Sequence, residues 1–364
     1  MTAIRRVLHK TLSILILMCS TAAFSQQTLK YTLVDLGLMG GTSAVATGVN
    51  NKGQIVGNVL YADGHQDCFL LTLFVSLVKW SGSAFPSRQP NYCSATAINQ
   101  NGDTAGAMYF KTGFTSYAVH AFRRTASGTI VHLAPLYGGT SLANGLNDSG
   151  IVVGESFTNQ YSPSAVRWDS AGNGTDLGGL PGSAIANAIS SYGSIVGRVG
   201  GYYLGYLGSF ASEWTNGSMV VLPPASFSQY FFFDEAYSIG NGSAFLVAGE
   251  SLEADGLYHV VEWGSGWRAD LGIIDGGSQV VTTDISSDNW ISGYGSPTAG
   301  FVHSPDCGTY SVSKLLDSSG TGWYLNRIYD MNDSHWLVGS AQSNQSPAHA
   351  ILLIPNSYPL CYPA

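Results

Sequence analysis

Short apolar runs separated by polar turn sequences recur along this chain, and residues 142–178 show the pattern most clearly. They predict four strands: Leu142–Leu146, Ile151–Ser156, Ala165–Trp168 and a last one that ends at Asp176-Leu177-Gly178. The turn at 147–150 reads Asn-Asp-Ser-Gly, in which Asn bonds its own backbone and Gly accepts a positive φ. The segment is therefore predicted to fold as one four-stranded antiparallel unit.

One phrase from this unit recurs seven times. Four close copies read NNKGQIVG, NQNGDTAG, NDSGIVVG and SSYGSIVG, and three looser copies follow. The copies end at Gly57, Gly106, Gly154, Gly197, Gly249, Gly293 and Gly339. Because the first and last of these glycines are 282 residues apart, the mean period is 47 residues. A period of that length is typical of stacked supersecondary units.

Seven such units predict an all-β fold, a seven-bladed β-propeller with four-stranded blades. The two ends of the chain favour closure of the ring. Tyr31–Gly37 has the pattern of a fourth strand with no first three, and His349–Leu353 has that of a third strand with no fourth. The N-terminal strand is therefore predicted to complete the last blade and to remove an open sheet edge.

Residues 1–25 have the features of a secretory signal peptide. A charged start with Arg5 and Lys10 precedes the apolar stretch Leu12–Cys19, and Ala23-Phe24-Ser25 forms the cleavage site. No later apolar stretch is long enough to span a bilayer as a helix. We therefore expect residues 26–364 to form a single propeller domain of an exported protein, either extracellular or periplasmic.

The charge balance excludes some partners. Three of the 15 lysines and arginines lie in the first 25 residues, so the exported chain has 12 against 23 acidic residues, a net charge near −11. Nucleic acids and anionic membranes bind to basic patches, so neither is expected as a partner. We expect a monomer with no cofactor and no metal. Aromatic residues make up 12% of the chain and charged residues only 10%, as in exported all-β proteins.

Four cysteines remain after cleavage of the signal peptide: Cys68, Cys93, Cys307 and Cys361. An even number in an exported chain predicts two disulfides. In a four-stranded blade, the turns between strands one and two and between strands three and four share one face, the turn face. The remaining connections share the other face, the loop face. Cys68 and Cys93 fall on the loop face and the other two on the turn face, which predicts Cys68–Cys93 and Cys307–Cys361.

Three pieces of the unit resemble the HAF-repeat family, a group of predicted extracellular bacterial repeat proteins. The matching residues are Ile98-Asn99, Gly150–Gly154, His120-Ala121-Phe122, Asp176-Leu177-Gly178 and Asp35–Gly41. Units one to four keep the pattern, whereas Ser212-Glu213-Trp214 and Val260–Trp263 replace His-Ala-Phe later in the chain. The resemblance implies export and a repeat fold, and it transfers no catalytic residue.

Two repeated residue types have both a structural and a metal-binding interpretation. The asparagines that open turns are Asn50, Asn99, Asn147 and Asn332. The histidines that begin third strands are His120, His259 and His349. The dense Asp pattern of calcium loops is missing, and the histidines lack the adjacent cysteines and carboxylates of a metal site. We therefore favour turn formation for the asparagines, and for the histidines a hydrogen bond to a neighbouring blade's backbone.

Asp284 and Asp330 are the sharpest exception to the repeat. They share one register in the first strands, where the other units have Gly48, Ala97, Gly145, Ala188 and Ser238. Their blades are neighbours, so the two carboxylates are predicted to lie near each other at the central axis. Paired carboxylates can hydrolyse glycosides or bind a cation, which makes them the catalytic candidates. The favoured interpretation is that each accepts hydrogen bonds from nearby amides or a hydroxyl.

Aromatic residues gather in the segments predicted for the loop face. The predicted ligand-binding residues are Tyr202, Tyr203, Tyr230, Phe231, Phe232, Phe233, Trp323 and Tyr324. Aromatic side chains on loops can stack on sugar rings or anchor a protein partner. The alternative is that they pack their own loops against the rim.

These observations favour a secreted, non-catalytic recognition or scaffold propeller that binds a glycan or protein ligand at the cell surface or in the envelope. The first alternative is an extracellular polysaccharide-acting hydrolase or lyase with carboxylates near the central channel, which requires Asp284 and Asp330 to share an open cavity. The second alternative is a purely structural surface repeat protein, which would have no pocket.

Overall fold

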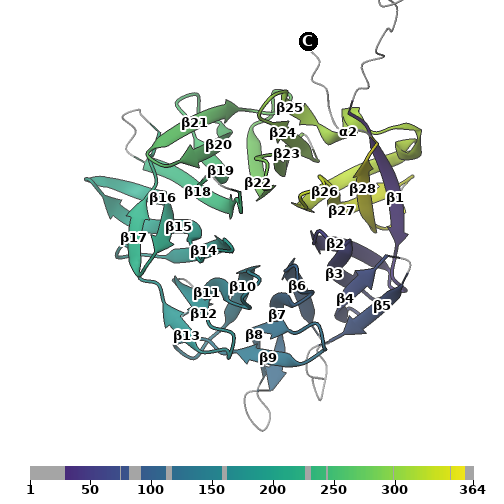
Figure 1. The fold of residues 1–364 in the computed structure, drawn as a ribbon, viewed down its shortest axis with the longest axis horizontal. Coiled ribbons are helices and arrows are strands. Elements are labelled where there is room, and N and C mark those ends of the chain that lie inside the picture. The colour runs from purple at the N-terminus through teal and green to yellow at the C-terminus, as the bar shows by residue number, and fades with distance from the viewer. Residues whose placement is uncertain are drawn as a thin grey trace, which may run out of the picture.

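The computed structural model describes residues 29–356, apart from 74, 82–91, 112–116, 158–161, 226–230, 243–244, 298 and 345. The predicted signal peptide lies outside these residues. The described strands form sheets arranged around an open centre (Figure 1). The fold is therefore an all-β propeller, as the repeat predicts.

Five sheets have four strands each, with antiparallel neighbours. Three of them are β2 (Ser43–Val49), β3 (Gln54–Leu60), β4 (Gln66–Thr72) and β5 (Ser76–Trp80); β6 (Cys93–Ile98), β7 (Thr104–Lys111), β8 (Tyr117–Arg124) and β9 (Ile130–Leu133); and β10 (Ser141–Leu146), β11 (Val152–Phe157), β12 (Pro163–Trp168) and β13 (Gly174–Asp176). The other two are β22 (Gln279–Ile285), β23 (Ile291–Ser296), β24 (Phe301–Ser304) and β25 (Gly308–Ser311); and β26 (Trp323–Met331), β27 (Leu337–Ser343), β28 (His349–Pro355) and β1 (Tyr31–Gly37).

The remaining strands form one eight-stranded sheet. They are β14 (Ala184–Ile189), β15 (Ile195–Tyr203), β16 (Tyr206–Thr215), β17 (Ser218–Val221), β18 (Phe231–Ile239), β19 (Val247–Leu252), β20 (Tyr258–Gly264) and β21 (Trp267–Gly272). A parallel pairing of residues 207–209 in β16 with residues 231–233 in β18 joins its two halves. The prediction of seven separate blades is therefore wrong: five blades stand alone, and these eight strands are continuous. The reason is that the apolar run at 231–233 pairs with β16 instead of forming a loop.

The repeated glycine lets the two inner strands of each sheet approach closely. The innermost strands, β2, β6, β10, β14, β18, β22 and β26, each have a bulge beside this glycine. A Cβ at Gly57 would lie 2.0 Å from the carbonyl oxygen of Val45, and at the other six copies the same contact would be 2.0 to 2.3 Å. No side chain fits there, which explains why glycine recurs at this position.

Asparagine side chains connect the turns on the turn face. The Oδ1 of Asn50 accepts hydrogen bonds from the N–H groups of Lys52 and Gln54 at 3.1 and 3.0 Å. Its Nδ2 donates to the carbonyl of Asn99 in the next turn at 3.0 Å. The same donation runs from Asn99 to Asn147, from Asn147 to Ser190 and from Asn332 to Asn50. The predicted turn role is confirmed, and the side chains also link consecutive turns around the ring.

The N-terminal strand closes the ring, as predicted. β1 pairs antiparallel with β28, with Tyr31 opposite Pro355 and Val34 opposite Leu352. Strands from the two ends of the chain thus share one sheet (Figure 1). That sheet is also bonded to the first one, where the N–H of Ala44 donates to the carbonyl of residue 348 at 2.9 Å.

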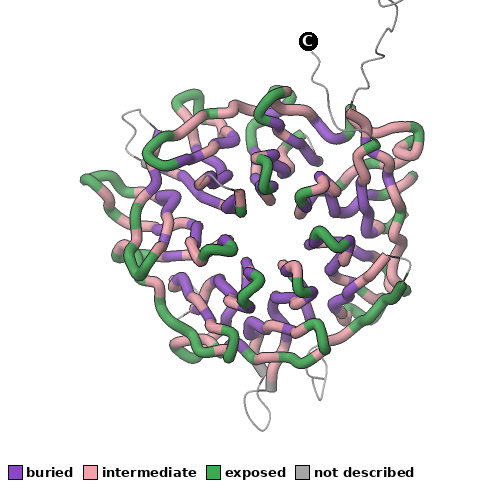
Figure 2. The backbone as a smooth tube through the Cα atoms, in the orientation of Figure 1, coloured by how far each residue is buried: buried purple, intermediate pink, exposed green. Residues whose placement is uncertain are grey.

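The hydrophobic core lies between neighbouring sheets. One cluster joins Ala46, Ile55 and Phe69 of the first sheet to Val338 and Leu352 of the last. Buried residues follow the inner strands, whereas exposed residues mark turns and the outer edge (Figure 2). Each sheet is covered by its neighbours, so burial of the first and last sheets depends on closure of the ring.

A disulfide joins Cys68 to Cys93, with their Cα atoms 5.3 Å apart, as predicted. Cys68 lies in β4 and Cys93 begins β6, so the bond links strands of neighbouring sheets; the expectation that both cysteines lie in loop segments is wrong. Disulfides of this kind typically contribute about 2–4 kcal/mol. Cys307 lies in the turn between β24 and β25. Its predicted partner, Cys361, lies outside the described residues, so that pairing stays a prediction.

Two short helical segments, α2 (Val312–Leu315) and η1 (Ser318–Gly320), lie between β25 and β26. In the part of the chain that the structure describes, no helix combines the length and apolar character needed to cross a membrane.

Removing residues 31–37 should leave β28 as an open edge of the last sheet. The deletion also removes the buried side chains of Tyr31 and Leu33 from their cluster. We expect the truncated chain to aggregate, or to melt at a temperature lower by about 10 °C or more. Thermal melting and size-exclusion chromatography measure this. An unchanged melting temperature and elution volume would contradict closure by β1.

Variants of Asn99 separate the turn from the link between turns. Asn99→Ala removes the acceptor of the Asn101 and Asp103 N–H groups and the donor to Asn147. We expect it to lower the free energy of unfolding by about 2–3 kcal/mol. Asn99→Ser keeps a turn acceptor, as Ser190 and Ser286 do in two other copies, and loses the donor to Asn147, so an intermediate loss is expected in urea denaturation. Wild-type stability of Asn99→Ser would mean that the links between turns contribute nothing.

Candidate functional site

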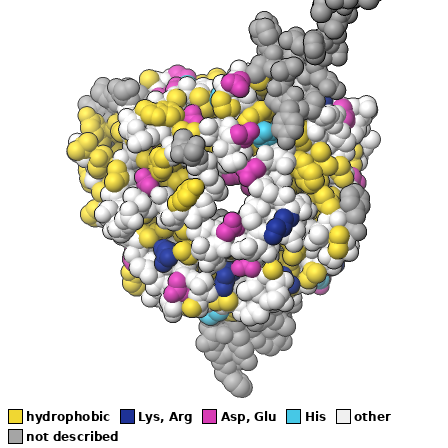
Figure 3. Space-filling view, viewed as in Figure 1, with side chains coloured by type: hydrophobic (Ala, Val, Ile, Leu, Met, Phe, Trp, Pro, Cys, Tyr) yellow, Lys and Arg dark blue, Asp and Glu magenta, His cyan; other side chains and the backbone are white. Residues whose placement is uncertain are grey.

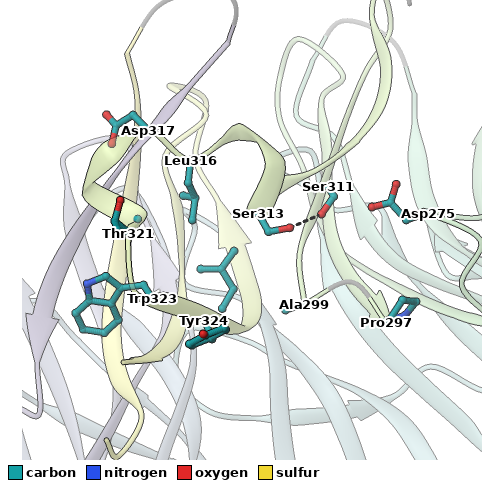
Figure 4. A pocket seen from close by; sticks show the side chains of 12 residues that line it. Asp275, Pro297, Ala299, Ser311, Ser313, Leu316, Asp317, Thr321, Trp323 and Tyr324 are labelled. Carbon is teal, nitrogen blue, oxygen red and sulfur yellow. Dashed lines mark hydrogen bonds between the residues drawn. The ribbon is translucent and has the colours of Figure 1, made fainter. Parts of the chain in front are cut away.

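A cavity of about 510 Å³ lies on the loop face, between the last blade and the one before it (Figure 4). Its walls come from the loop after β23, the end of β25, the helical segments α2 and η1, and the start of β26. The side chains around it include two aromatic rings, three hydroxyl groups and two carboxylates: Trp323, Tyr324, Ser311, Ser313, Thr321, Asp275 and Asp317.

The helical wall of the cavity is attached to the N-terminal strand through Asp317. Its carboxylate accepts hydrogen bonds from the Thr32 hydroxyl at 2.6 Å, the Asn356 amide at 2.8 Å and the Ser319 N–H at 2.8 Å. The Asp317 N–H donates to the carbonyl of Tyr31 at 3.0 Å. These bonds, led by those from Ser319, hold the pKa of Asp317 well below its usual range. The wall is thus fixed by the strand that closes the ring.

The two aromatic rings differ in how free they are. Tyr324 is 64% exposed, and Figure 4 shows its ring beside the cavity. Trp323 is half-buried and packs edge-on against His349, with ring centroids 5.4 Å apart. His349 in turn bonds Asp35 of β1 through Nδ1 at 2.9 Å. Tyr324 therefore offers an open ring face, whereas the ring of Trp323 is occupied by its contact with His349.

Polar groups lie across the cavity from Tyr324 (Figure 4). The hydroxyls of Ser311 and Ser313 bond each other at 2.8 Å, and Asp275 accepts a bond from the Lys314 ammonium at 2.7 Å. The charge of Asp275 is thereby balanced by an exposed cation. An exposed aromatic face opposite hydroxyl groups and a neutralised carboxylate suits a ligand with both an apolar face and many hydroxyl groups.

The structure places Trp323 and Tyr324 together at this cavity, and both belong to β26. The expectation that they lie on a loop between blades is wrong, because β26 is nine residues long and begins at Trp323. An additional bulge between Leu325 and Arg327 accommodates the extra length.

Tyr202 and Tyr203 lie elsewhere, at the end of β15. The expectation of a loop is wrong here too, because β15 and β16 continue as a hairpin until Tyr203 pairs with Tyr206. Tyr202 is 69% exposed, whereas Tyr203 packs against Phe210 with centroids 5.5 Å apart. The hairpin projects from the opposite side of the ring from β26 (Figure 1), so these tyrosines cannot share a site with Tyr324.

Phe231, Phe232 and Phe233 form the start of β18, so the loop predicted for them is wrong. Phe232 is buried against Phe210 and Tyr206, at centroid distances of 5.8 and 5.2 Å. An apolar run beside an open strand of β16 gains both backbone hydrogen bonds and burial by pairing with it. Tyr230 lies outside the described residues.

Asp284 and Asp330 line one cavity of about 230 Å³ at the turn-face end of the central channel. Figure 3 shows acidic side chains gathered beside the central opening. Asp330 Oδ2 accepts a hydrogen bond from the Val49 N–H at 2.7 Å, and Asp284 Oδ1 accepts one from the Ser238 hydroxyl at 2.8 Å. Both carboxylates thus have the amide and hydroxyl donors that the structural interpretation requires, and both also face one cavity.

The environment of the pair favours the protonated forms. Loss of hydration raises the pKa of Asp284 to about 7. Loss of hydration, followed by the charge of Asp284, raises the pKa of Asp330 well above its usual range. Both carboxylates therefore hold a proton at a higher pH than an ordinary aspartate does, which is a property of catalytic carboxylates and also of buried structural ones.

The predicted bond to the backbone of a neighbouring blade is confirmed for His120 only. His259 and His349 bond carboxylates of their own sheets, so that prediction is wrong for them. His120 Nε2 bonds the carbonyl of Gly139, in the connection to the next blade, at 3.0 Å. His259 Nδ1 bonds Asp270 at 2.8 Å. Among the described residues, no group of three or more His, Cys, Asp or Glu side chains is arranged to hold a metal ion.

Sequence reasoning missed most of the polar side of the cavity on the loop face. Asp275 and Ser313 stand in connections that the repeat does not cover, and Ser311 ends β25 just before one of them. The only signal was Asp317-Ser318-Ser319-Gly320, which has the composition of a capped turn. Its position beside Tyr324 depends on the bond to β1 and is not encoded locally.

No protein-family model and no curated protein matches this chain. Among solved structures, the β-propeller domain of the Trilobed protease from Pyrococcus furiosus is similar over 86% of this chain and 94% of its own length, with a TM-score of 0.53 and 10% identity. The BP39L lectin from Burkholderia pseudomallei aligns over 90% of this chain and 96% of its own (TM-score 0.49, 12% identity). TolB from Acinetobacter baumannii aligns over 84% and 80% (TM-score 0.42, 13% identity). The first match supports the propeller fold, and identities this low carry nothing about activity.

Asp284→Asn tests the titration of the channel carboxylates. The folded pKa of about 7 lies above the value of an unfolded aspartate, so the folded state holds an extra proton between about pH 4 and 7. The stability of the wild type should therefore fall as the pH rises through this range. We expect the melting temperature of the variant, relative to wild type, to be higher at pH 8 than at pH 4.5. The same difference at both pH values would contradict the raised pKa.

Proposed function

We propose that this chain is an exported, non-catalytic recognition propeller that binds a surface or envelope glycan at the cavity beside Trp323 and Tyr324. The observation that carries the proposal is the open ring of Tyr324, 64% exposed, on the rim of a 510 Å³ cavity with hydroxyl groups on its other wall. Membership of the HAF-repeat family is part of the same proposal, because that family is extracellular.

The geometry suits a sugar because the two kinds of contact that it needs lie opposite each other. One face of a pyranose ring is apolar and stacks on an aromatic side chain. Its equatorial hydroxyls then reach the wall that carries Ser311, Ser313 and Asp275. A purely structural surface protein would have no need of such a cavity.

Preorganisation supports the same conclusion. Tyr324 stands on a strand, and the opposing wall is held by the bonds of Asp317 to Thr32 and Asn356. A site built on fixed elements loses little conformational entropy when a ligand binds. The disulfide between Cys68 and Cys93 agrees with export, because such bonds persist in oxidising compartments.

A second candidate function is hydrolysis or lysis of a polysaccharide by Asp284 and Asp330. One observation favours it: the two carboxylates line a single cavity in the channel. The hydrogen bonds that each already accepts from Val49 and Ser238 favour a structural role instead. Release of reducing sugar by the wild type but not by Asp284→Asn would favour the enzyme.

Tyr324→Ala tests the recognition site. A glycan array on the exported chain identifies a ligand, and calorimetry then measures its affinity for the variant. We expect at least tenfold weaker binding, about 1.4 kcal/mol, with an unchanged melting temperature. Tyr192→Ala is the matched control, because Tyr192 is 82% exposed in the turn between β14 and β15. Equal affinities for both variants and wild type would overturn the proposed site.

A further inference from the structure

The bulge in each innermost strand places one side chain in the central channel. On four consecutive strands this side chain donates a hydrogen bond to the carbonyl of the next innermost strand. The pairs are Thr47 to Ala95 at 2.8 Å, Thr96 to Ala143 at 2.8 Å, Asn144 to Ala186 at 3.1 Å and Asn187 to Ala236 at 2.9 Å. The bulge residue therefore links neighbouring strands wherever the repeat is regular.

The other three bulge residues, Tyr237, Thr283 and Tyr329, do not follow this pattern. The Tyr237 hydroxyl donates to Glu250 at 3.0 Å, and the Thr283 hydroxyl bonds Ser292 of its own sheet at 3.0 Å. Their strands β18, β22 and β26 are neighbours, so the departure covers one continuous side of the channel (Figure 1). Tyr237 and Tyr329 stand where the regular strands have a short side chain that bonds the next innermost strand. Departures of this kind from a repeated pattern are expected at functional sites.

These tyrosines border a cavity of about 620 Å³ at the loop-face end of the channel. Tyr294 joins them from β23, and the guanidinium of Arg327 lies 4.0 Å from the centre of its ring. Across the channel, the wall includes Tyr92. Among the described residues that line this cavity, none is Asp, Glu, Lys or Arg.

We propose that this cavity is a second ligand site, for a neutral saccharide of one or two rings. An anionic ligand would meet no positive charge on the wall and would lose its hydration without compensation. Phenol rings and the amides of Asn58, Asn144 and Asn187 offer stacking and both donors and acceptors to a neutral polyol. The volume falls within the range of about 300–1,000 Å³ found for small-molecule sites.

This site goes beyond the proposed function, because none of the residues that the structure describes lines both this cavity and the one beside Tyr324. The two are distinguished by separate variants. Tyr329→Thr restores the residue type that the regular strands have at Thr47, so it should fold at least as well as wild type. Tyr329→Phe keeps the ring and removes only the hydroxyl.

Cellobiose, maltose and N,N′-diacetylchitobiose are the probes, with glucuronic acid and glucosamine as charged controls. Calorimetry and saturation-transfer NMR on the exported chain should find that at least one neutral disaccharide binds. Tyr329→Thr should weaken that binding at least tenfold at an unchanged melting temperature, Tyr329→Phe should weaken it less, and Tyr324→Ala should leave it unchanged. The proposal would be overturned if Tyr329→Thr bound the disaccharide as tightly as wild type, or if only Tyr324→Ala lost binding. It would also be overturned if the charged sugars bound more tightly than the neutral ones, or if no disaccharide bound at millimolar concentration.

Discussion

The pairing of β1 with β28 is the contact on which the rest of this structure depends. A ring of sheets buries its apolar faces only when every sheet has two neighbours, and without β1 the last sheet would end in an open edge. The same strand also holds the candidate recognition site, because Tyr31 and Thr32 bond the segment that carries Asp317. The strand that closes the ring therefore also holds one wall of the site in place.

Around the centre, the ring is held by side chains that repeat with the sequence. Asparagines such as Asn50 and Asn99 link consecutive turns, and bulge residues such as Thr47 link consecutive inner strands. The glycine of each copy allows the close approach that the bulge requires. Where the bulge residues make no such link, on β18, β22 and β26, tyrosines and carboxylates face the channel instead.

Local sequence patterns predicted the parts of the fold that local chemistry determines. The turn at 147–150, the strands around it, the closing strand 31–37 and the bond between Cys68 and Cys93 all follow from residue types and period. The shared register of Asp284 and Asp330 also predicted that they lie near each other, and they line one cavity. Residues at the same register of neighbouring innermost strands lie at the same level of the channel.

The wrong predictions concern segments whose structure is set by contacts with residues far away in the sequence. Residues 231–233 have the composition of an aromatic loop, yet an unpaired segment of β16 lies beside them and extends β18. That pairing merges two blades into one sheet, and the period of the repeat does not predict it. Trp323 and Tyr324 were identified as ligand candidates, but the wall opposite them depends on a bond to a strand nearly 300 residues away in the chain. Long-range contacts of this kind leave no local signal.

Hydrogen–deuterium exchange of residues 26–364 tests the role of β1 most directly. Residues 31–37 should exchange as slowly as β27 and β28, and residues 316–325 should be protected with them, because one network of hydrogen bonds holds these segments. Fast exchange of residues 31–37 beside a protected β27 would mean that the N-terminal strand does not close the ring. That result would contradict both the closed propeller and the recognition site held in place by β1.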